Sequence, residues 1–181
     1  MLVEEQLFIA ALQNKETQNR AFQQLVSQYK ERLYWHIRRI VLNHDDADDV
    51  LQNTFVKIYR NIHNFKGESA LFSWMYRIAT NESLTFLKQK AKMANITDEE
   101  LQNSLVQNLQ ADSYFEGEEI QLKLQQAIAK LPEKQRLVFN MKYFEELKYE
   151  EMSQILDTSV GALKSSYHHA VKKLEDYLTE D

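Results

Sequence analysis

Glycine and proline are nearly absent from this chain: its 181 residues include three glycines and one proline. These two residues interrupt helices and supply the sharp turns of hairpins, so their scarcity favours long helices joined by few tight turns. Apolar residues also recur at intervals of three and four through most of the sequence, which is the spacing of an amphipathic helix. We therefore expect an all-α protein.

Four helical patterns occupy the first half of the chain, with a polar loop at about residues 61–67 between the third and the fourth. Asn43 stands before the third pattern and Ser69 before the fourth, and both residue types cap helix N-termini. The repeated apolar residues would form the core of one small helical domain. The four patterns cover about residues 2–13, 21–42, 43–60 and 69–92.

Three aromatic residues lie close together on the fourth pattern, at positions 72, 74 and 76. Residues two apart on a helix point in different directions, so the three rings cannot share one face. We expect Phe72 in the core and Tyr76 partly buried. For Trp74, core packing and an exposed position both remain open.

The formal net charge of −5 is unevenly distributed. Residues 1–92 carry 13 basic and 10 acidic side chains, residues 93–119 carry 0 and 7, and residues 120–181 carry 9 and 10. Thr97 and Glu100 form the sequence pattern of a capping box, which predicts a short helix near residues 98–110 with looser chain on both sides. We therefore expect two small helical domains, residues 1–94 and 120–181, joined by an acidic linker, residues 95–119, that contains a short helix.

The stretch from Lys148 to Leu174 predicts two helices joined by a tight polar turn. Asp157 tolerates the left-handed conformation that such a turn uses, and Ser159 can cap the second helix. A helix-turn-helix of this layout places its second helix in the DNA major groove. A helical hairpin with a solvated face would show the same pattern, and this segment alone does not separate the two.

Several classes of protein do not fit this sequence. It has no cysteine, no glycine-rich phosphate-binding loop and no recognisable catalytic triad. His168 and His169 are neighbours on a helix, point about 100° apart and lack further ligands, so we expect no metal. The N-terminus lacks the basic residues of a signal peptide, and no apolar run approaches the about 20 residues of a membrane span. We expect a soluble cytoplasmic protein that is not an enzyme, uses no cofactor or small-molecule substrate and does not insert into a membrane.

Three segments, in this order, resemble the extracytoplasmic-function group of the sigma-70 family, the bacterial transcription initiation factors. DDADDVLQNTFVKIYRNI resembles the part of region 2 that docks on core RNA polymerase. FKGESALFSWMYRIATNESLTFLKQKAK resembles the part that reads and melts the minus-10 element, and LPEKQRLVFNMKYFEELKYEEMSQILDTSVGALKSSYHHAVKKL resembles region 4, which reads the minus-35 element. The resemblance implies a sigma factor whose partners are core RNA polymerase, promoter DNA and an anti-sigma factor.

The resemblance also assigns roles to residues of region 2. An acidic and amide face with two apolar neighbours would contact the polymerase, although an ordinary capped helix start has the same composition. A loop and the helix after it would capture a flipped base and bind phosphates. The polymerase contacts would be Asp45, Asp48, Asp49, Gln52, Asn53, Phe55 and Val56. The minus-10 contacts would be Phe65, Lys66, Glu68, Ser69, Trp74, Arg77, Asn81 and Lys88.

In region 4 the second helix of the helix-turn-helix would contact the minus-35 element. Ser166 and His169 stand where the family usually has arginine, so bidentate contacts to guanine are missing there and affinity would depend more on the polymerase. The minus-35 contacts would be Ser159, Lys164, Ser165, Ser166, Tyr167, His168, His169 and Lys172.

A competing hypothesis is a helix-turn-helix regulator whose N-terminal helices form a sensor and which binds DNA without polymerase. The linker adds a further expectation for the sigma factor. Promoter elements two helical turns apart are separated by about 70 Å, and the 25 linker residues span about 80 to 90 Å when fully extended but about 60 Å with the predicted helix intact. We expect a compact free state with that helix formed, and an opened state on polymerase.

Overall fold

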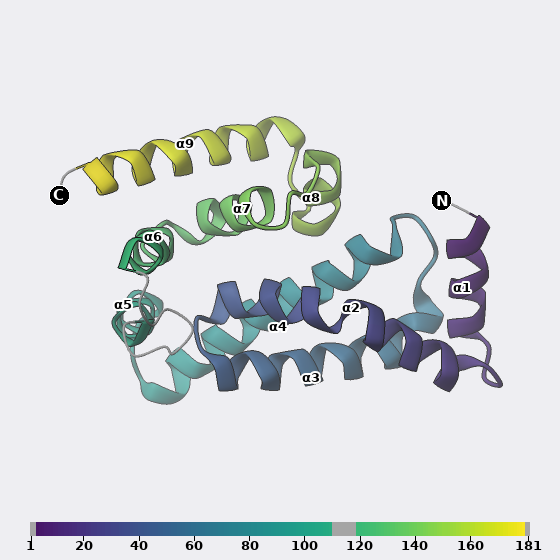
Figure 1. Ribbon diagram of the computed structural model, residues 1–181. Coiled ribbons are helices and arrows are strands. Elements are labelled where there is room, and N and C mark those ends of the chain that lie inside the picture. Colours follow the sequence, from purple (N-terminus) through teal and green to yellow (C-terminus); the bar gives the residue numbers. More distant parts are fainter. Residues whose placement is uncertain (1–2, 110–118, 180–181) are drawn as a thin grey trace.

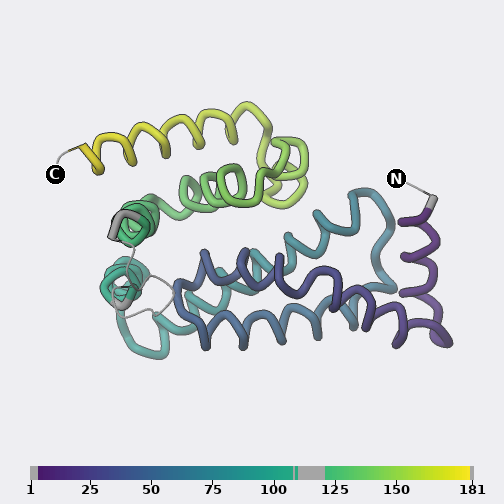
Figure 2. Tube along the Cα trace, viewed as in Figure 1, coloured from purple at the N-terminus to yellow at the C-terminus, as the bar shows by residue number. Residues whose placement is uncertain are grey.

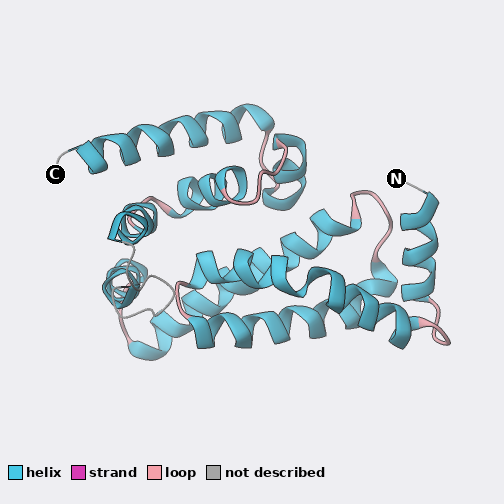
Figure 3. Ribbon diagram, in the orientation of Figure 1, coloured by secondary structure: helices cyan, strands magenta, loops and turns pink. Residues whose placement is uncertain are grey.

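The computed structural model describes residues 3–109 and 119–179, and throughout these residues the regular structure is helical, without strands (Figure 3). Two groups of helices lie in layers one above the other, and a connecting helix stands beside them at one end (Figure 1). We call helices α1 to α4 the first unit and helices α6 to α9 the second unit. The all-α expectation is confirmed.

The first unit is built around three long helices. Helix α1 (Val3–Gln13) packs across the end of α2 (Gln18–Val41), which is followed by α3 (His44–Asn61), a short 3-10 turn η1 (Ile62–Asn64) and α4 (Leu71–Ala94). Asn43 caps α3 as predicted, because its side-chain oxygen accepts a hydrogen bond of 2.9 Å from the amide of Asp46. Leu25, Leu33 and Ile37 are completely buried between these helices.

The start of α4 differs from the sequence prediction. Ser69 does not cap this helix: α4 begins at Leu71, and the Ser69 hydroxyl only donates to the neighbouring Ala70 carbonyl at 3.4 Å. The amide of Leu71 instead donates to the Glu5 carboxylate of α1 at 3.1 Å. A carboxylate is a favourable partner for a helix N-terminus because it meets the positive end of the helix dipole.

The linker contains the predicted helix, α5 (Asp98–Asn108). Its capping box is complete: the Thr97 hydroxyl accepts from the Glu100 amide at 3.1 Å, and the Glu100 carboxylate accepts from the Thr97 amide at 2.7 Å. Leu105 belongs to one apolar cluster with Ala91 of α4 and Ala129 of α6. The predicted end of this helix at residue 110 and the acidic stretch that follows to residue 118 lie outside the described residues. Figure 2 shows the helices of both units along the Cα trace.

The second unit consists of α6 (Glu119–Ala129), α7 (Glu133–Tyr143), α8 (Tyr149–Leu156) and α9 (Val160–Thr179). Its apolar residues form two clusters. One lies between α6, α7 and α9, and the other joins residues of α7, α8 and α9 to the core of the first unit. Met152 and Ile155 of α8 belong to this shared core and are buried. The two units are therefore packed against each other with α5 helical, which is the compact arrangement expected of the free chain.

Among the described residues, no helix is both long enough and apolar enough to span a lipid bilayer.

Candidate nucleic-acid interface

The second helix of the helix-turn-helix, α9, presents a polar face to solvent. Asp157 ends α8 in the left-handed conformation, with a φ of 50°, as its residue type predicted. The Ser159 hydroxyl then accepts a hydrogen bond of 3.3 Å from the Ala162 amide near the start of α9. Leu163 and Leu174 are buried and hold one side of α9 against the second unit. The predicted minus-35 residues that are exposed on α9 are Lys164, Ser165, His168, His169 and Lys172.

The other two predicted residues of α9 are less accessible. The Tyr167 ring stacks on Phe139 with 5.8 Å between the ring centroids, so its aromatic face serves the core of the second unit. Ser166 is half-buried beside it. The Lys164 ammonium lies 5.7 Å from the ring centroid of Tyr149, which is a cation–π contact between α9 and α8. Burial raises the pKa of that Tyr149 hydroxyl, so the ring faces Lys164 in its neutral form.

The acidic face predicted to meet the polymerase lies along α3. Asp45, Asp48, Asp49, Gln52 and Asn53 are all exposed and recur at helical spacing, so they form one continuous polar strip. Val56 continues this strip with 47% of its surface exposed. Phe55 is half-buried and meets Phe22 edge to face at 6.2 Å. Asp46, which the prediction left out of this face, pairs with Lys90 of α4.

The loop before α4 differs from what the sequence suggested. The Phe65 ring is not presented as a stacking surface: 6% of its surface is exposed, and its centroid lies 5.2 Å from that of Trp74. Its backbone is held as well, since the Gln13 side-chain amide donates to the Phe65 carbonyl at 2.9 Å. The neighbouring Lys66 and Glu68 are exposed, and Ser69 is half-buried.

The aromatic residues of α4 are arranged around an inward-facing tyrosine. Tyr76, expected to be partly buried, has 1% of its surface exposed, and this burial raises its pKa. Phe72, expected in the core, is only half-buried. Its ring centroid lies 4.1 Å from that of Tyr76 and 4.8 Å from the Arg32 guanidinium. Trp74, left open by the sequence, is also half-buried. Of these three rings only that of Tyr76 is buried, and the rings of Phe72 and Trp74 lie at the edge of the core.

The second unit covers part of the predicted minus-10 surface. Helix α8 packs on α4, and the Arg77 guanidinium donates to the Gln154 carbonyl at the C-terminal end of α8, with its Nε atom at 2.9 Å. A carbonyl at this end of a helix carries partial negative charge, so it attracts a guanidinium. Asn81 and Lys88 remain exposed further along α4.

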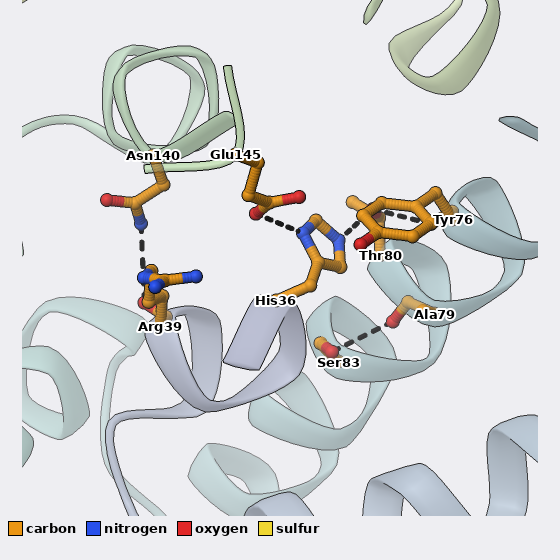
Figure 4. Close-up of polar contacts among 8 residues, drawn as sticks. All are labelled: His36, Arg39, Tyr76, Ala79, Thr80, Ser83, Asn140 and Glu145. Atoms are coloured by element: carbon orange, nitrogen blue, oxygen red, sulfur yellow. Dashed lines mark hydrogen bonds and ion pairs between the residues drawn. The ribbon is translucent and has the colours of Figure 1, made fainter. Parts of the chain in front are cut away.

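Sequence reasoning missed a buried contact between the two units. His36 of α2 is 2% exposed, and its Nδ1 atom lies 2.9 Å from a carboxylate oxygen of Glu145, which follows α7 (Figure 4). The Asn140 side-chain amide donates to the Arg39 carbonyl at 3.5 Å in the same interface. The Arg39 guanidinium also lies 4.7 Å from the ring centroid of Phe144. His36 and Glu145 are 109 residues apart, so no local pattern marked them.

A groove of about 360 Å³ separates α4 and α5 from the start of α7. Lys88 stands at its edge, and Arg136 lines it from α7. Burial lowers the pKa of the Arg136 guanidinium, and the nearby Glu133 carboxylate opposes part of this effect, so the pKa is about 10. No group of three or more histidine, aspartate or glutamate side chains that could hold a metal ion occurs in the described part of the chain.

Comparison with known proteins identifies the two units. Residues 25–93 match the family model for sigma-70 region 2, and residues 121–174 match the model for sigma-70, region 4. The chain is 32% identical to the ECF RNA polymerase sigma-E factor of Haemophilus influenzae over 165 residues, which cover 87% of each protein. It is 31% identical to the ECF RNA polymerase sigma factor SigW of Bacillus subtilis over 169 residues, which cover 88% of this chain and 90% of the relative.

Solved structures show the same fold. The structure of CnrH in complex with the cytosolic domain of CnrY aligns with a TM-score of 0.69 at 22% identity, over 98% of both chains. That of the sigma factor RpoE in complex with the anti-sigma factor NepR from Bartonella quintana aligns with a TM-score of 0.67 at 20% identity, over 88% of this chain and 98% of the other. Because both region models match in order and the curated relatives align over most of the chain, this protein belongs to the extracytoplasmic-function group of the sigma-70 family of RNA polymerase sigma factors.

Proposed function

We propose that this sigma factor assigns separate tasks to three of its helices. The exposed strip of α3 docks on core RNA polymerase, the loop before α4 and the outer face of α4 read and open the minus-10 element, and α9 reads the minus-35 element. In this arrangement the protein acts as the promoter-specificity subunit of the polymerase in the cytoplasm and is not an enzyme by itself. The domains are residues 1–94 and 120–181, and the linker of residues 95–119 connects them.

The exposed face of α9 carries this proposal. Leu163 and Leu174 hold the helix from one side, so its lysine, serine and histidine side chains project together from the other. Ammonium groups bind phosphates, and hydroxyl and imidazole groups reach base edges in the major groove. The strip on α3 supports the polymerase contact because exposed carboxylates accelerate association with a basic partner and fix its register.

Phe65 has a different task in this scheme. Its ring packs on Trp74 instead of facing solvent, so it supports the loop that carries Lys66 and Glu68. Base capture by Phe65 itself would require its ring to leave the core, whereas Lys66 and Glu68 are exposed and available as they stand.

The partners follow from the same assignment. Core RNA polymerase and promoter DNA are the partners of a sigma factor, and we propose an anti-sigma protein as the third. The support for this third partner is a solved structure with the same fold, which is a complex of the sigma factor RpoE with the anti-sigma factor NepR.

Run-off transcription with core enzyme on a randomised promoter library tests the proposal. We expect transcripts that depend on the protein and start downstream of a shared pair of sequence elements. Lys164→Ala should reduce transcription severalfold, and Lys134→Ala, which removes an exposed lysine of α7 outside the proposed surface, should leave it near the wild-type level. DNA binding by the purified protein as a dimer without polymerase, with no effect on transcription by core enzyme, would instead support the sensor-regulator alternative.

A further inference from the structure

The groove between α4, α5 and the start of α7 has walls from both regions and from the linker. Leu84 and Leu87 line it from α4, and Leu101 and Leu105 line it from α5. Leu131, which lies between α6 and α7, adds a fifth leucine. Its volume of about 360 Å³ lies at the small end of the about 300 to 1,000 Å³ that ligand pockets occupy. The groove is therefore large enough for a small ligand with an apolar body.

A buried guanidinium lines the same apolar space. Arg136 of α7 is 2% exposed. A guanidinium has five N–H donors. Within the described residues Arg136 uses one of them, because its Nη1 atom donates to the Ala129 carbonyl at 3.3 Å and its Nε atom is buried without a hydrogen-bond partner. The edge formed by Nε and Nη2 is therefore unpaired, and arginine binds a carboxylate through two such N–H groups in parallel.

The positive charge of this side chain is also unpaired. The pKa of Arg136 is about 10, so its guanidinium is charged at neutral pH. In the described part of the chain, no carboxylate lies within ion-pair distance of it. A buried charge without a partner is costly. An anion that reached Arg136 from the groove would supply both the missing hydrogen bonds and the missing charge.

A role as a helix cap does not account for a charged group at this position. The Ala129 carbonyl ends α6 and already accepts a hydrogen bond from the Gln102 side-chain amide of α5. Its hydrogen bond with Arg136 is long, at 3.3 Å, and leaves the other donors of the guanidinium unused. A neutral amide can cap this helix, as Gln102 does, without the cost of burying a charge.

The rim of the groove favours a ligand with a single negative charge. Five of the side chains that line the groove are charged and exposed, and three of them are acidic and two basic. Their formal charge of −1 would repel a dianion more strongly than a monoanion. A phosphate monoester carries about −1.5 to −2 at neutral pH, whereas a carboxylate carries one charge. The five residues are Lys88, Asp98, Glu99, Lys130 and Glu133.

We propose that this groove is a binding site for a small organic carboxylate, in which Arg136 binds the carboxylate group and the five leucines contact its apolar body. The ligand would be an effector that is bound and released unchanged. Its contacts would come from α4, α5 and α7 at the same time. A bound ligand would therefore hold α5 in its docked, helical position between the two regions.

The site would oppose assembly on polymerase, and this consequence rests on the proposed function and on unwinding of α5 in the complex. A ligand that binds only the docked form stabilises that form by mass action. At a free ligand concentration about ten times its Kd, the affinity of the protein for core enzyme should fall about elevenfold.

Isothermal titration calorimetry with octanoate tests the site on the whole chain, without polymerase or DNA and below the concentration at which octanoate forms micelles. We expect saturable binding of one octanoate per chain. Octanol has the same apolar chain without the charge, and acetate has the carboxylate with little apolar surface. Each should bind at least about tenfold more weakly than octanoate. Equal binding of octanol would mean that Arg136 takes no part, and equal binding of acetate would mean the same of the leucines, so either result contradicts the proposal.

The first variant removes the charge. Arg136→Met should weaken octanoate binding by at least about tenfold, because the N–H donors and the charge are lost while a side chain of similar length remains. The fold should survive, since replacing buried charges with apolar side chains of similar size is often neutral or stabilising. Lys134→Met removes a charge from an exposed position of the same helix and should bind octanoate like the wild type.

The second variant blocks the groove from α4 and keeps Arg136. Leu84→Glu places a carboxylate in the groove, where it would pair with Arg136 or repel the ligand, so octanoate binding should be lost. Thr85→Glu adds the same charge at the exposed neighbouring position and should bind octanoate like the wild type. Circular dichroism checks that each variant is folded, and Leu84→Glu keeps the test decisive if Arg136→Met does not fold.

The absence of saturable octanoate binding, or wild-type binding by folded Arg136→Met or by Leu84→Glu, would overturn the proposal. The proposed function fails separately, because its test is transcription with core enzyme. A protein that binds octanoate through Arg136 but directs no transcription would keep the site and lose the promoter assignment.

Discussion

Replacing Leu105 of the linker helix α5 should make the protein bind core RNA polymerase more tightly, although it removes a stabilising contact. Leu105 is 5% exposed and lies in the apolar cluster that fixes α5 to α4 and α6. Helix α5 has 11 residues, and an isolated helix of that length is only marginally stable in water, so α5 depends on this packing. Leu105→Ala should weaken the docked helix by about 2 to 5 kcal/mol.

The expected gain follows from the distance that the linker must span. The helical α5 covers about 16 Å, and the same residues extended cover about 36 to 40 Å. Promoter elements two helical turns apart need a span of about 70 Å, so the unwound linker fits and the helical one is marginal. If α5 unwinds in the complex, part of the binding free energy is used to undo its packing. Leu105→Ala removes at least about 2 kcal/mol of that cost, and binding should become about 30-fold tighter.

Equilibrium titration of labelled protein with core enzyme measures this effect. Gln107→Ala changes an exposed residue of the same helix and should leave affinity unchanged. Thr97→Ala removes the cap of α5, costs about 1 kcal/mol and should give an intermediate, about fivefold gain. Equal or weaker binding by Leu105→Ala, with circular dichroism showing a folded protein, would refute the reasoning and indicate that α5 stays docked on polymerase.

Three further predictions concern the proposed surfaces and the core. Lys172→Ala should weaken binding of holoenzyme to promoter DNA and reduce the slope of log affinity against log salt by about 0.9, as measured by filter binding at several salt concentrations; an unchanged slope would place Lys172 away from the phosphates. Asp48→Asn with Asp49→Asn should slow association with core enzyme in stopped-flow measurements at low salt more than it speeds dissociation, and an effect on dissociation alone would contradict a steering role. Because burial raises the Tyr76 pKa, its contribution to stability is complete below about pH 10, where the unfolded side chain begins to ionise, and is lost as pH rises further. Tyr76→Phe should therefore show a shallower loss of unfolding free energy in urea titrations above pH 10, and parallel curves for the two proteins would contradict this.

Local patterns in the sequence were sufficient for the helices and for most of their ends. The capping box at Thr97, the cap at Asn43 and the left-handed turn at Asp157 were all predicted correctly, because each depends on residues within one helical turn. The order of region 2 and region 4 could be recognised for the same reason, since each motif is a continuous stretch of chain. Ser69 was misassigned as a cap because the true partner of the α4 N-terminus, Glu5, is 66 residues away from Leu71.

The sequence by itself determined an all-helical chain with two recognisable units, an acidic linker and an α9 with one apolar and one polar face, because periodicity and capping act over three or four residues. Tertiary structure decided which side chains those units conceal. The ring of Phe65 is in the core, Arg77 is held by α8, and His36 lies against the Glu145 carboxylate. The contacts of Arg77 and His36 depend on how the two packed units meet. Their partners are 77 and 109 residues away in the chain, so helical periodicity cannot mark them.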